Sequence, residues 1–159
     1  MGVDTDFYNL VLVLHILAVI IGFGGVFIAG FYGREALDRP GREGLAVAET
    51  TLKVTGAVPT VSIYAVPILG ILLVLLSDDT WKFSEAWISL SFLLYIVMVG
   101  LATGIQVPTI RKMVAMRSGS EGAQSLPMQA LGKKAATVSA IVNVLWVVIL
   151  FLMVFKPGH

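Results

Sequence analysis

The sequence predicts an all-α integral membrane protein in which four transmembrane helices form one antiparallel bundle. Hydrophobic residues make up 57% of the 159 residues and charged residues only 13%, whereas a soluble domain carries about 25% charged residues. The charges are also excluded from four runs, 7–33, 54–77, 86–110 and 135–155, which are 27, 24, 25 and 21 residues long. A hydrocarbon core is crossed by about 20 apolar helical residues. We therefore expect spans at about 8–32, 54–77, 86–110 and 135–155, in a single membrane domain over residues 1–159.

The first apolar run has to be distinguished from a secretory signal, which joins a basic start to a short apolar stretch. The residues that lead into this run, MGVDTDF, are acidic through Asp4 and Asp6. The run is also about twice as long as a signal requires. We expect it to remain in the protein as a helix.

Two of the polar connections contain helix signals of their own. Asp38-Arg-Pro-Gly is typical of a turn, and REGLAVAETTLK after it predicts an extension of the second helix. Leu45, Ala48 and Leu52 share one side of that extension. Ser125-Leu-Pro predicts the start of the last helix, with proline in its first turn.

The basic residues predict how the bundle is oriented. Nine of the 11 Lys and Arg lie in the first and third connections, at Arg34, Arg39, Arg42, Lys53, Arg111, Lys112, Arg117, Lys133 and Lys134. The other two are Lys82 and Lys156. Because cytoplasmic loops are enriched in Lys and Arg, we expect these two connections inside and both termini outside.

Small and polar residues mark the helix faces that turn inward, because membrane helices pack through such residues. The faces that we expect to point inward are His15, Ala18, Gly22, Gly25 and Ala29; Gly56, Pro59, Ile63, Pro67 and Gly70; Ser91, Tyr95, Ala102 and Gln106; and Ser139, Asn143 and Trp146. In the second helix, Pro67 has no N–H, so the carbonyl of Ile63 needs another donor, with Ser62 or a neighbouring polar group as candidates.

His15 is the candidate site residue, because an ionisable side chain inside a membrane span indicates function by default. At a rise of about 1.5 Å per residue, His15, Tyr95 and Trp146 all come roughly 12–14 Å below the outer edge. The site that we expect there has His15 as an axial haem ligand or proton-transfer group, with Tyr95, Asn143 and Trp146 lining the pocket. The alternative is a neutral histidine that serves packing and bonds to Tyr95, Asn143 or a freed carbonyl.

Several site classes are excluded or disfavoured by the residues present. There is no cysteine, so thiolate metal sites and cysteine nucleophiles are excluded, and we expect no metal site. No acidic residue lies within a span, which disfavours a carboxylate-driven antiporter. The basic connections follow from topology and anionic lipid, so we expect no nucleic-acid partner. We expect lipid and either a second copy or a partner membrane subunit as partners; an accessory or structural subunit and a small-solute channel or transporter stay open as roles.

A family resemblance covers the whole chain. The stretch LHILAVIIGFGGVF, with Leu14-His15 followed by Gly24-Gly25, and the ending FLMVFKPGH resemble a bacterial superfamily of small four-span membrane proteins. It includes the HemJ-type membrane protoporphyrinogen oxidase, the copper-resistance D membrane domain and an uncharacterised group. The oxidase resemblance implies a haem-associated enzyme that uses His15, although FYGREALD after the first helix lacks the histidines of that pattern. The uncharacterised group fits best, which implies a multi-pass protein of the bacterial plasma membrane.

Overall fold

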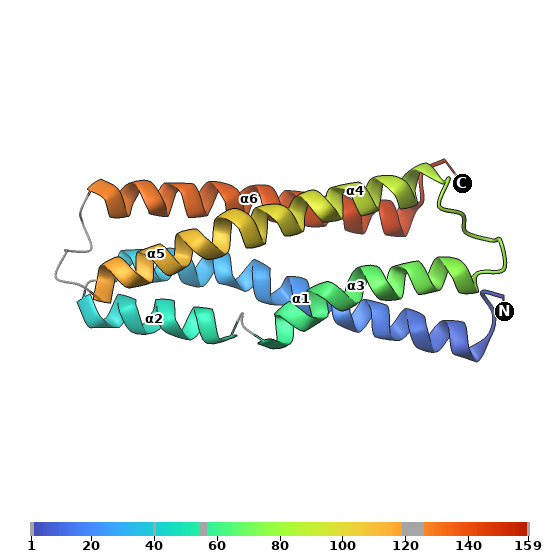
Figure 1. Cartoon of the computed structure of the whole chain (residues 1–159), viewed down its shortest axis with the longest axis horizontal. Coiled ribbons are helices and arrows are strands. Elements are labelled where there is room, and N and C mark those ends of the chain that lie inside the picture. Colours follow the sequence, from blue (N-terminus) through green and yellow to red (C-terminus); the bar gives the residue numbers. More distant parts are fainter. Residues whose placement is uncertain (1, 40, 55–56, 119–125, 159) are drawn as a thin grey trace.

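The computed structural model describes residues 2–39, 41–54, 57–118 and 126–158. The helical elements are α1 (Asp6–Asp38), α2 (Gly41–Val54), α3 (Ala57–Leu76), α4 (Ala86–Leu101), the π-helical segment η1 (Ala102–Gln106), α5 (Val107–Ser118) and α6 (Leu126–Phe155). No strand lies among these residues, which confirms the all-α prediction. Figure 1 shows an elongated bundle with both chain ends at the same end.

Within the described part of the chain, four helical stretches are long and apolar enough to cross a membrane, as the sequence predicts. They are Asp6–Ala36, Pro59–Leu76, Ala86–Met116 and Leu126–Phe155. The first, third and last stretches are longer than the charge-free runs from which they were predicted. The 30 residues of α6 span about 45 Å, against about 30 Å for a hydrocarbon core. The extra length lies at the end of the bundle opposite the chain termini (Figure 1).

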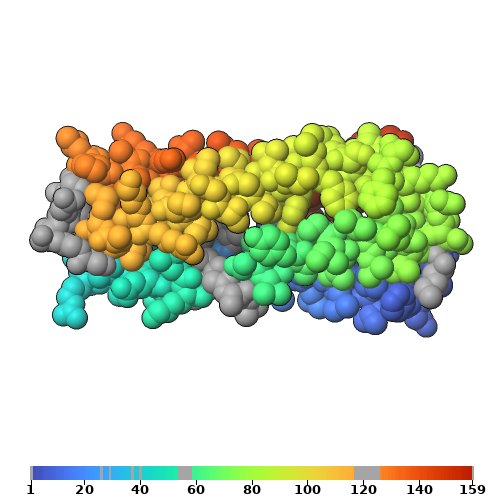
Figure 2. Space-filling model, viewed as in Figure 1, coloured from blue at the N-terminus to red at the C-terminus, as the bar shows by residue number. Residues whose placement is uncertain are grey.

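The bundle has two halves, defined by which helices face one another. In the termini half, α1 packs against α3, and α4 packs against α6. In the distal half, α1 packs against α2, α5 against α6, and α2 against α5. Helix α5 continues the line of α4, so α4 and α5 together run the length of the face seen in Figure 2, beside α3 and α2. The segment predicted as an extension of the second helix is the helix α2, which packs against α1 and α5 in the distal half. Residues 55 and 56, between α2 and α3, lie outside the described residues.

Glycines of α1 let α3 approach closely in the termini half. A Cβ on Gly22 would lie 3.1 Å from Cγ1 and 3.2 Å from the backbone nitrogen of Ile63. A Cβ on Gly25 would lie 3.1 Å from the Pro59 ring. The small-residue face of the first span is therefore filled by α3 at these positions and leaves no gap. Gly56, predicted on the same face of the second helix, lies outside the described residues.

The carbonyl freed by Pro67 has a partner from another helix. The hydroxyl of Tyr95 on α4 donates a hydrogen bond to the Ile63 carbonyl oxygen. This confirms that a polar group satisfies that carbonyl, and it identifies the group as Tyr95 rather than Ser62. The bond joins α3 to α4 at the centre of the termini half.

The connection between α3 and α4 is fastened to the end of the chain. Ser77 closes α3 by donating to the Val74 carbonyl, and its hydroxyl accepts from the backbone N–H of Trp81. The ammonium of Lys156, which follows α6, lies 3.8 Å from the centre of the Trp81 ring. This cation–π contact ties the end of α6 to the connection. The last residue, His159, lies outside the described residues.

Candidate functional site

His15 lies on α1 with its ring against α3. Its Cε1 atom is 3.4 Å from the place that a Cβ on Gly70 would occupy, so the missing side chain of Gly70 makes room for the ring. The Val66 backbone lies beside the imidazole. The Nδ1 atom is buried and has no hydrogen-bond partner among the described residues. The ring therefore faces the protein rather than lipid, as predicted.

The other predicted pocket residues only partly gather. Tyr95 and Trp146 both contact Phe23, with ring centres 6.1 and 6.2 Å apart and interplanar angles of 86° and 29°. These rings fill the centre of the termini half. Asn143 is half-buried on α6, and His15 belongs to the neighbouring contact between α1 and α3. The structure thus joins Tyr95 and Trp146 through Phe23, a residue that the sequence reasoning did not select.

Neither cavity described for this chain gives a haem macrocycle space at His15. A macrocycle would have to lie flat across a free ring nitrogen. Helix α3 crosses the ring at Val66 and Gly70, with Nδ1 enclosed. The two cavities characterised among the described residues do not include His15 in their lining. We therefore derive no haem chemistry from this residue.

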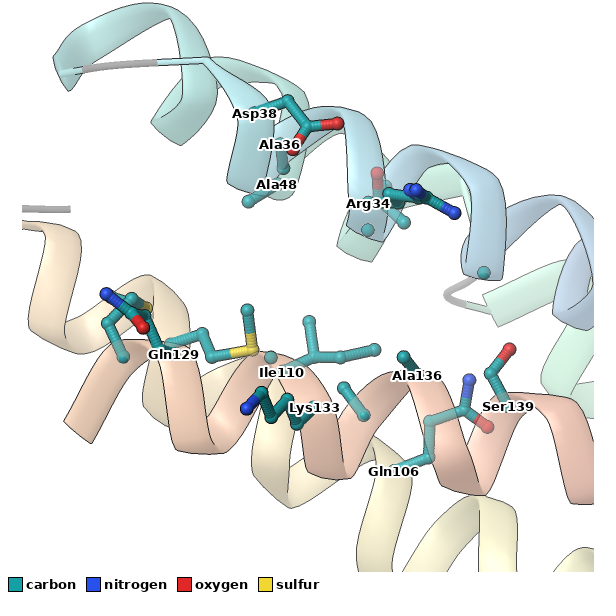
Figure 3. A pocket seen from close by; sticks show the side chains of 17 residues that line it. Arg34, Ala36, Asp38, Ala48, Gln106, Ile110, Gln129, Lys133, Ala136 and Ser139 are labelled. Atoms are coloured by element: carbon teal, nitrogen blue, oxygen red, sulfur yellow. The ribbon is translucent and has the colours of Figure 1, made fainter. Parts of the chain in front are cut away.

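The larger cavity lies in the distal half, between the pair α1 and α2 and the pair α5 and α6. Its volume is about 480 Å³. Figure 3 shows the two helix pairs on opposite sides, with side chains reaching in from both. Its lining residues are Gly30, Gly33, Arg34, Ala36, Asp38, Ala48, Thr51, Gln106, Ile110, Met113, Met128, Gln129, Gly132, Lys133, Ala135, Ala136 and Ser139. Most of these residues are apolar or small, and the polar ones are distributed along the length of the cavity.

Gln106 marks the inner end of the cavity, nearest the centre of the bundle. Its side chain is 5% exposed, and its Oε1 atom is buried without a hydrogen-bond partner among the described residues. In an apolar setting an unpaired acceptor of this kind costs about 1–3 kcal/mol. A molecule bound in the adjacent cavity could donate a hydrogen bond to this oxygen.

The π-helical segment η1 positions Gln106. Pro108 has no N–H for the helical ladder, and the turn before it widens so that the Val107 N–H donates to the Ala102 carbonyl, five residues back. Single π-turns of this kind occur often at functional sites. Gln106 is the last residue of the segment and is its buried member. The widened turn therefore ends on the side chain that lines the cavity.

Ser139 and Gly30 complete the inner end. A Cβ on Gly30 would lie 2.5 Å from the Ser139 hydroxyl oxygen, so glycine is needed for this approach of α1 to α6. Gly33, one turn further along α1, also lines the cavity, and nothing lies within 4 Å of its Cβ position. Close packing thus gives way to open space between these two glycines.

The charged side chains separate along the cavity. Helical side chains lean toward the start of their own helix, which directs Arg34 toward Gly30 and directs Lys133 toward Gln129. Figure 3 shows Arg34 on the α1 side across from Gln106 and Ser139, with Gln129 at the other end. No ion-pair partner of Arg34 lies among the described residues, whereas nearby Arg39 pairs with Glu35 at 2.8 Å. The cavity is therefore lined near this end by an exposed guanidinium on the α1 side and by a carboxamide and a hydroxyl on the opposite side.

Sequence reasoning placed Gln106 and Ser139 on inward faces but did not select them as a site. One signal was available: Gln106 is a polar residue two positions before a proline, close to the end of a charge-free run. Arg34 is likewise the first charged residue after the first run. Among the described residues, no group of three His, Cys, Asp or Glu side chains lies together as a metal site.

Comparison with protein families matches residues 9–157 to the family described as "Predicted integral membrane protein (DUF2269)". No curated protein and no solved structure matches the chain.

Proposed function

Because the chain belongs to this family of predicted integral membrane proteins, we propose that it acts in the membrane as a binding protein for a small amphipathic molecule. The site is the cavity of the distal half. The bound molecule contacts apolar walls and places its polar group at Gln106 and Ser139.

One observation carries this proposal: Gln106, whose buried Oε1 has no hydrogen-bond partner among the residues that the structure describes, lines a cavity. Buried polar groups in proteins are almost always hydrogen-bonded, and each exception calls for an explanation. A bound molecule that donates a hydrogen bond supplies one. The orphan atom and the space beside it then belong to a single site.

The size and composition of the cavity support the same reading. Ligand sites are concave, mostly apolar spaces of about 300–1,000 Å³ with a few polar groups that fix orientation. This cavity has about 480 Å³. From Gln129 to Ser139 it follows α6 for about 15 Å, at about 1.5 Å per residue. Met113 and Met128 in its wall are adaptable side chains that can fit ligands of different shape.

Native mass spectrometry of the purified protein tests the proposal. We expect a retained small molecule, lost when Ala136→Leu fills the cavity. Ala140→Leu adds the same side chain to an exposed position one turn along α6, outside the cavity lining, and is the control. Equal retention in both variants, or no retained molecule in the wild type, would contradict the proposal.

The other expected roles stay predictions. Nothing in the geometry favours an accessory subunit, a second copy of the chain or a solute pathway over the cavity site. The relationship to haem-associated oxidases also stays a prediction, and the visible absorption spectrum of the purified protein tests it. A Soret band that disappears in His15→Ala would establish His15 as a ligand despite its packing against α3.

A further inference from the structure

The inner end of the cavity lies at the level where charges begin on the surrounding helices. Arg34 directly follows the charge-free run 7–33. Gln106 lies within one turn of the end of the run 86–110, and Ser139 lies one turn inside the run 135–155. Charge-free runs end where a helix leaves the hydrocarbon core and meets the headgroup layer. Arg34 therefore lies at the depth of lipid head groups, and Gln106 and Ser139 lie one helical turn deeper, roughly 6 Å at about 1.5 Å per residue.

The three side chains differ in what they can bind. A guanidinium only donates, in a fork that matches phosphate and carboxylate oxygens. A hydroxyl donates and accepts, and a carboxamide offers two donors and one acceptor. Arg34 thus calls for an oxyanion, whereas the orphan Oε1 of Gln106 calls for a hydrogen-bond donor. A ligand that satisfies both has an anionic group and a hydrogen-bond donor, such as a hydroxyl, close together.

We propose that the inner end of the cavity binds a glycerol phosphate group, with the phosphate on Arg34 and a glycerol hydroxyl on Gln106. Ser139 contributes its hydroxyl to the same group. The inference rests on the proposed function, because it names the polar part of the molecule held in the cavity. Glycerol phosphate chemistry has two sources, the head group of phosphatidylglycerol and free glycerol phosphate, and the experiment below separates them.

Other head groups leave part of this site unsatisfied. Choline and ethanolamine head groups carry a phosphate for Arg34, but their quaternary or primary ammonium group would lie beside the guanidinium as a like charge, while Asp38 lies toward the other end of the cavity. A simple fatty acid has a carboxylate for Arg34 but, when ionised, no donor for Gln106. A neutral alcohol satisfies Gln106 and leaves the guanidinium without an anion. A hydroxylated phosphodiester meets both requirements.

The experiment measures which lipid stays with the protein. The full chain is reconstituted in bilayers that hold equal amounts of phosphatidylglycerol and phosphatidylcholine, and the retained lipids are quantified after mild detergent extraction. We expect the wild-type protein to retain phosphatidylglycerol in preference. Loss of a charge-assisted hydrogen bond should lower this preference about tenfold in Arg34→Gln. Gln106→Met should lower it severalfold.

The matched control is Lys112→Gln. Lys112 is an exposed cation on α5, in the same half but outside the cavity lining, so this variant makes the same charge change. An equal loss in Arg34→Gln and Lys112→Gln would assign the preference to general surface charge and overturn the proposal. Thermal unfolding of each variant checks that it is folded. Arg34→Lys keeps the positive charge but lacks the forked guanidinium, so its preference for phosphatidylglycerol should lie between those of the wild type and Arg34→Gln.

Two further arms separate the remaining possibilities. Free glycerol phosphate added to the protein in phosphatidylcholine bilayers should raise its unfolding temperature if the soluble compound is a ligand. If it does not, while phosphatidylglycerol is retained, the lipid is the source. If Ala136→Leu expels a molecule without a phosphate, the proposed function stands and the headgroup assignment fails. If no molecule is expelled by Ala136→Leu, both fail.

Discussion

The sharpest test of the cavity site is the substitution Gln106→Met, which removes the orphan amide and keeps the shape of the side chain. Methionine is unbranched and close to glutamine in length, so the packing around position 106 should change little. Volume-conserving exchanges inside a protein shift stability by less than about 1.5 kcal/mol. The wild-type side chain is 5% exposed with an unpaired Oε1. Removing an unpaired buried acceptor returns about 1–3 kcal/mol.

We therefore expect ligand-free Gln106→Met to be more stable than the wild type by about 1 kcal/mol. A substitution that deletes a polar side chain usually has the opposite effect when that side chain is paired. The expected sign therefore distinguishes an orphan from a paired group. This expected sign depends on the surroundings of one atom, Oε1 of Gln106.

The assay is the free energy of unfolding in detergent, followed by the helical circular dichroism of delipidated protein and repeated with ligand present. A ligand that binds the folded state adds RT ln(1 + [L]/Kd) to the stability. Bound lipid should raise the unfolding free energy of the wild type and raise that of Gln106→Met much less. The wild type should therefore be the more stable protein when lipid is bound, and the variant the more stable one without it. If delipidated Gln106→Met is less stable than the wild type by about 1 kcal/mol or more, the amide is paired and the reasoning fails.

Three contacts of the termini half can be tested by further substitutions. Tyr95→Phe should cost about 1–2 kcal/mol of unfolding free energy, since the carbonyl that Pro67 leaves free then loses its donor. In a Pro67→Ala background, which restores the N–H, most of that loss should vanish, and an additive double mutant would contradict the assignment. Gly22→Ala should cost about 1–3 kcal/mol by pushing α3 away; Gly24→Ala, with nothing within 4 Å, should be neutral or raise stability by up to about 1 kcal/mol. Lys156→Met should cost about 0.5–1 kcal/mol by removing the cation–π contact, and Lys156→Arg should keep it.

The number and position of the spans could be predicted from the sequence because charge exclusion is a local signal. Each run is continuous along the chain, and hydrocarbon excludes charge without regard to what neighbouring helices do. The need of the Ile63 carbonyl for a donor was predictable for the same reason, since it follows from Pro67 alone. The donor was not predictable. Tyr95 is 32 positions away, and only the packing of α3 on α4 decides that it rather than Ser62 makes the bond.

The cavity could not be predicted because its parts come from four helices with no common pattern in the sequence. Counting rise per residue placed His15, Tyr95 and Trp146 at one depth, but depth alone does not bring side chains together. In the structure Tyr95 and Trp146 share Phe23, while His15 packs against α3. The π-helical segment adds a rotation that a regular helix does not have. It decides which face of α5 meets the cavity.

The two halves of the bundle put glycines of one helix to opposite uses. At Gly22 and Gly25, α3 approaches so closely that a single methyl group would collide with it. At Gly33 the same residue type faces open space, because α2 has replaced α3 as the neighbour of α1 and does not approach at this position. A run of small residues therefore does not by itself distinguish a packed interface from a binding site. What distinguishes them is the partner: where the opposing helix fills the space, the glycines hold two helices together, and where it does not, an unpaired polar atom such as Oε1 of Gln106 is left facing a cavity.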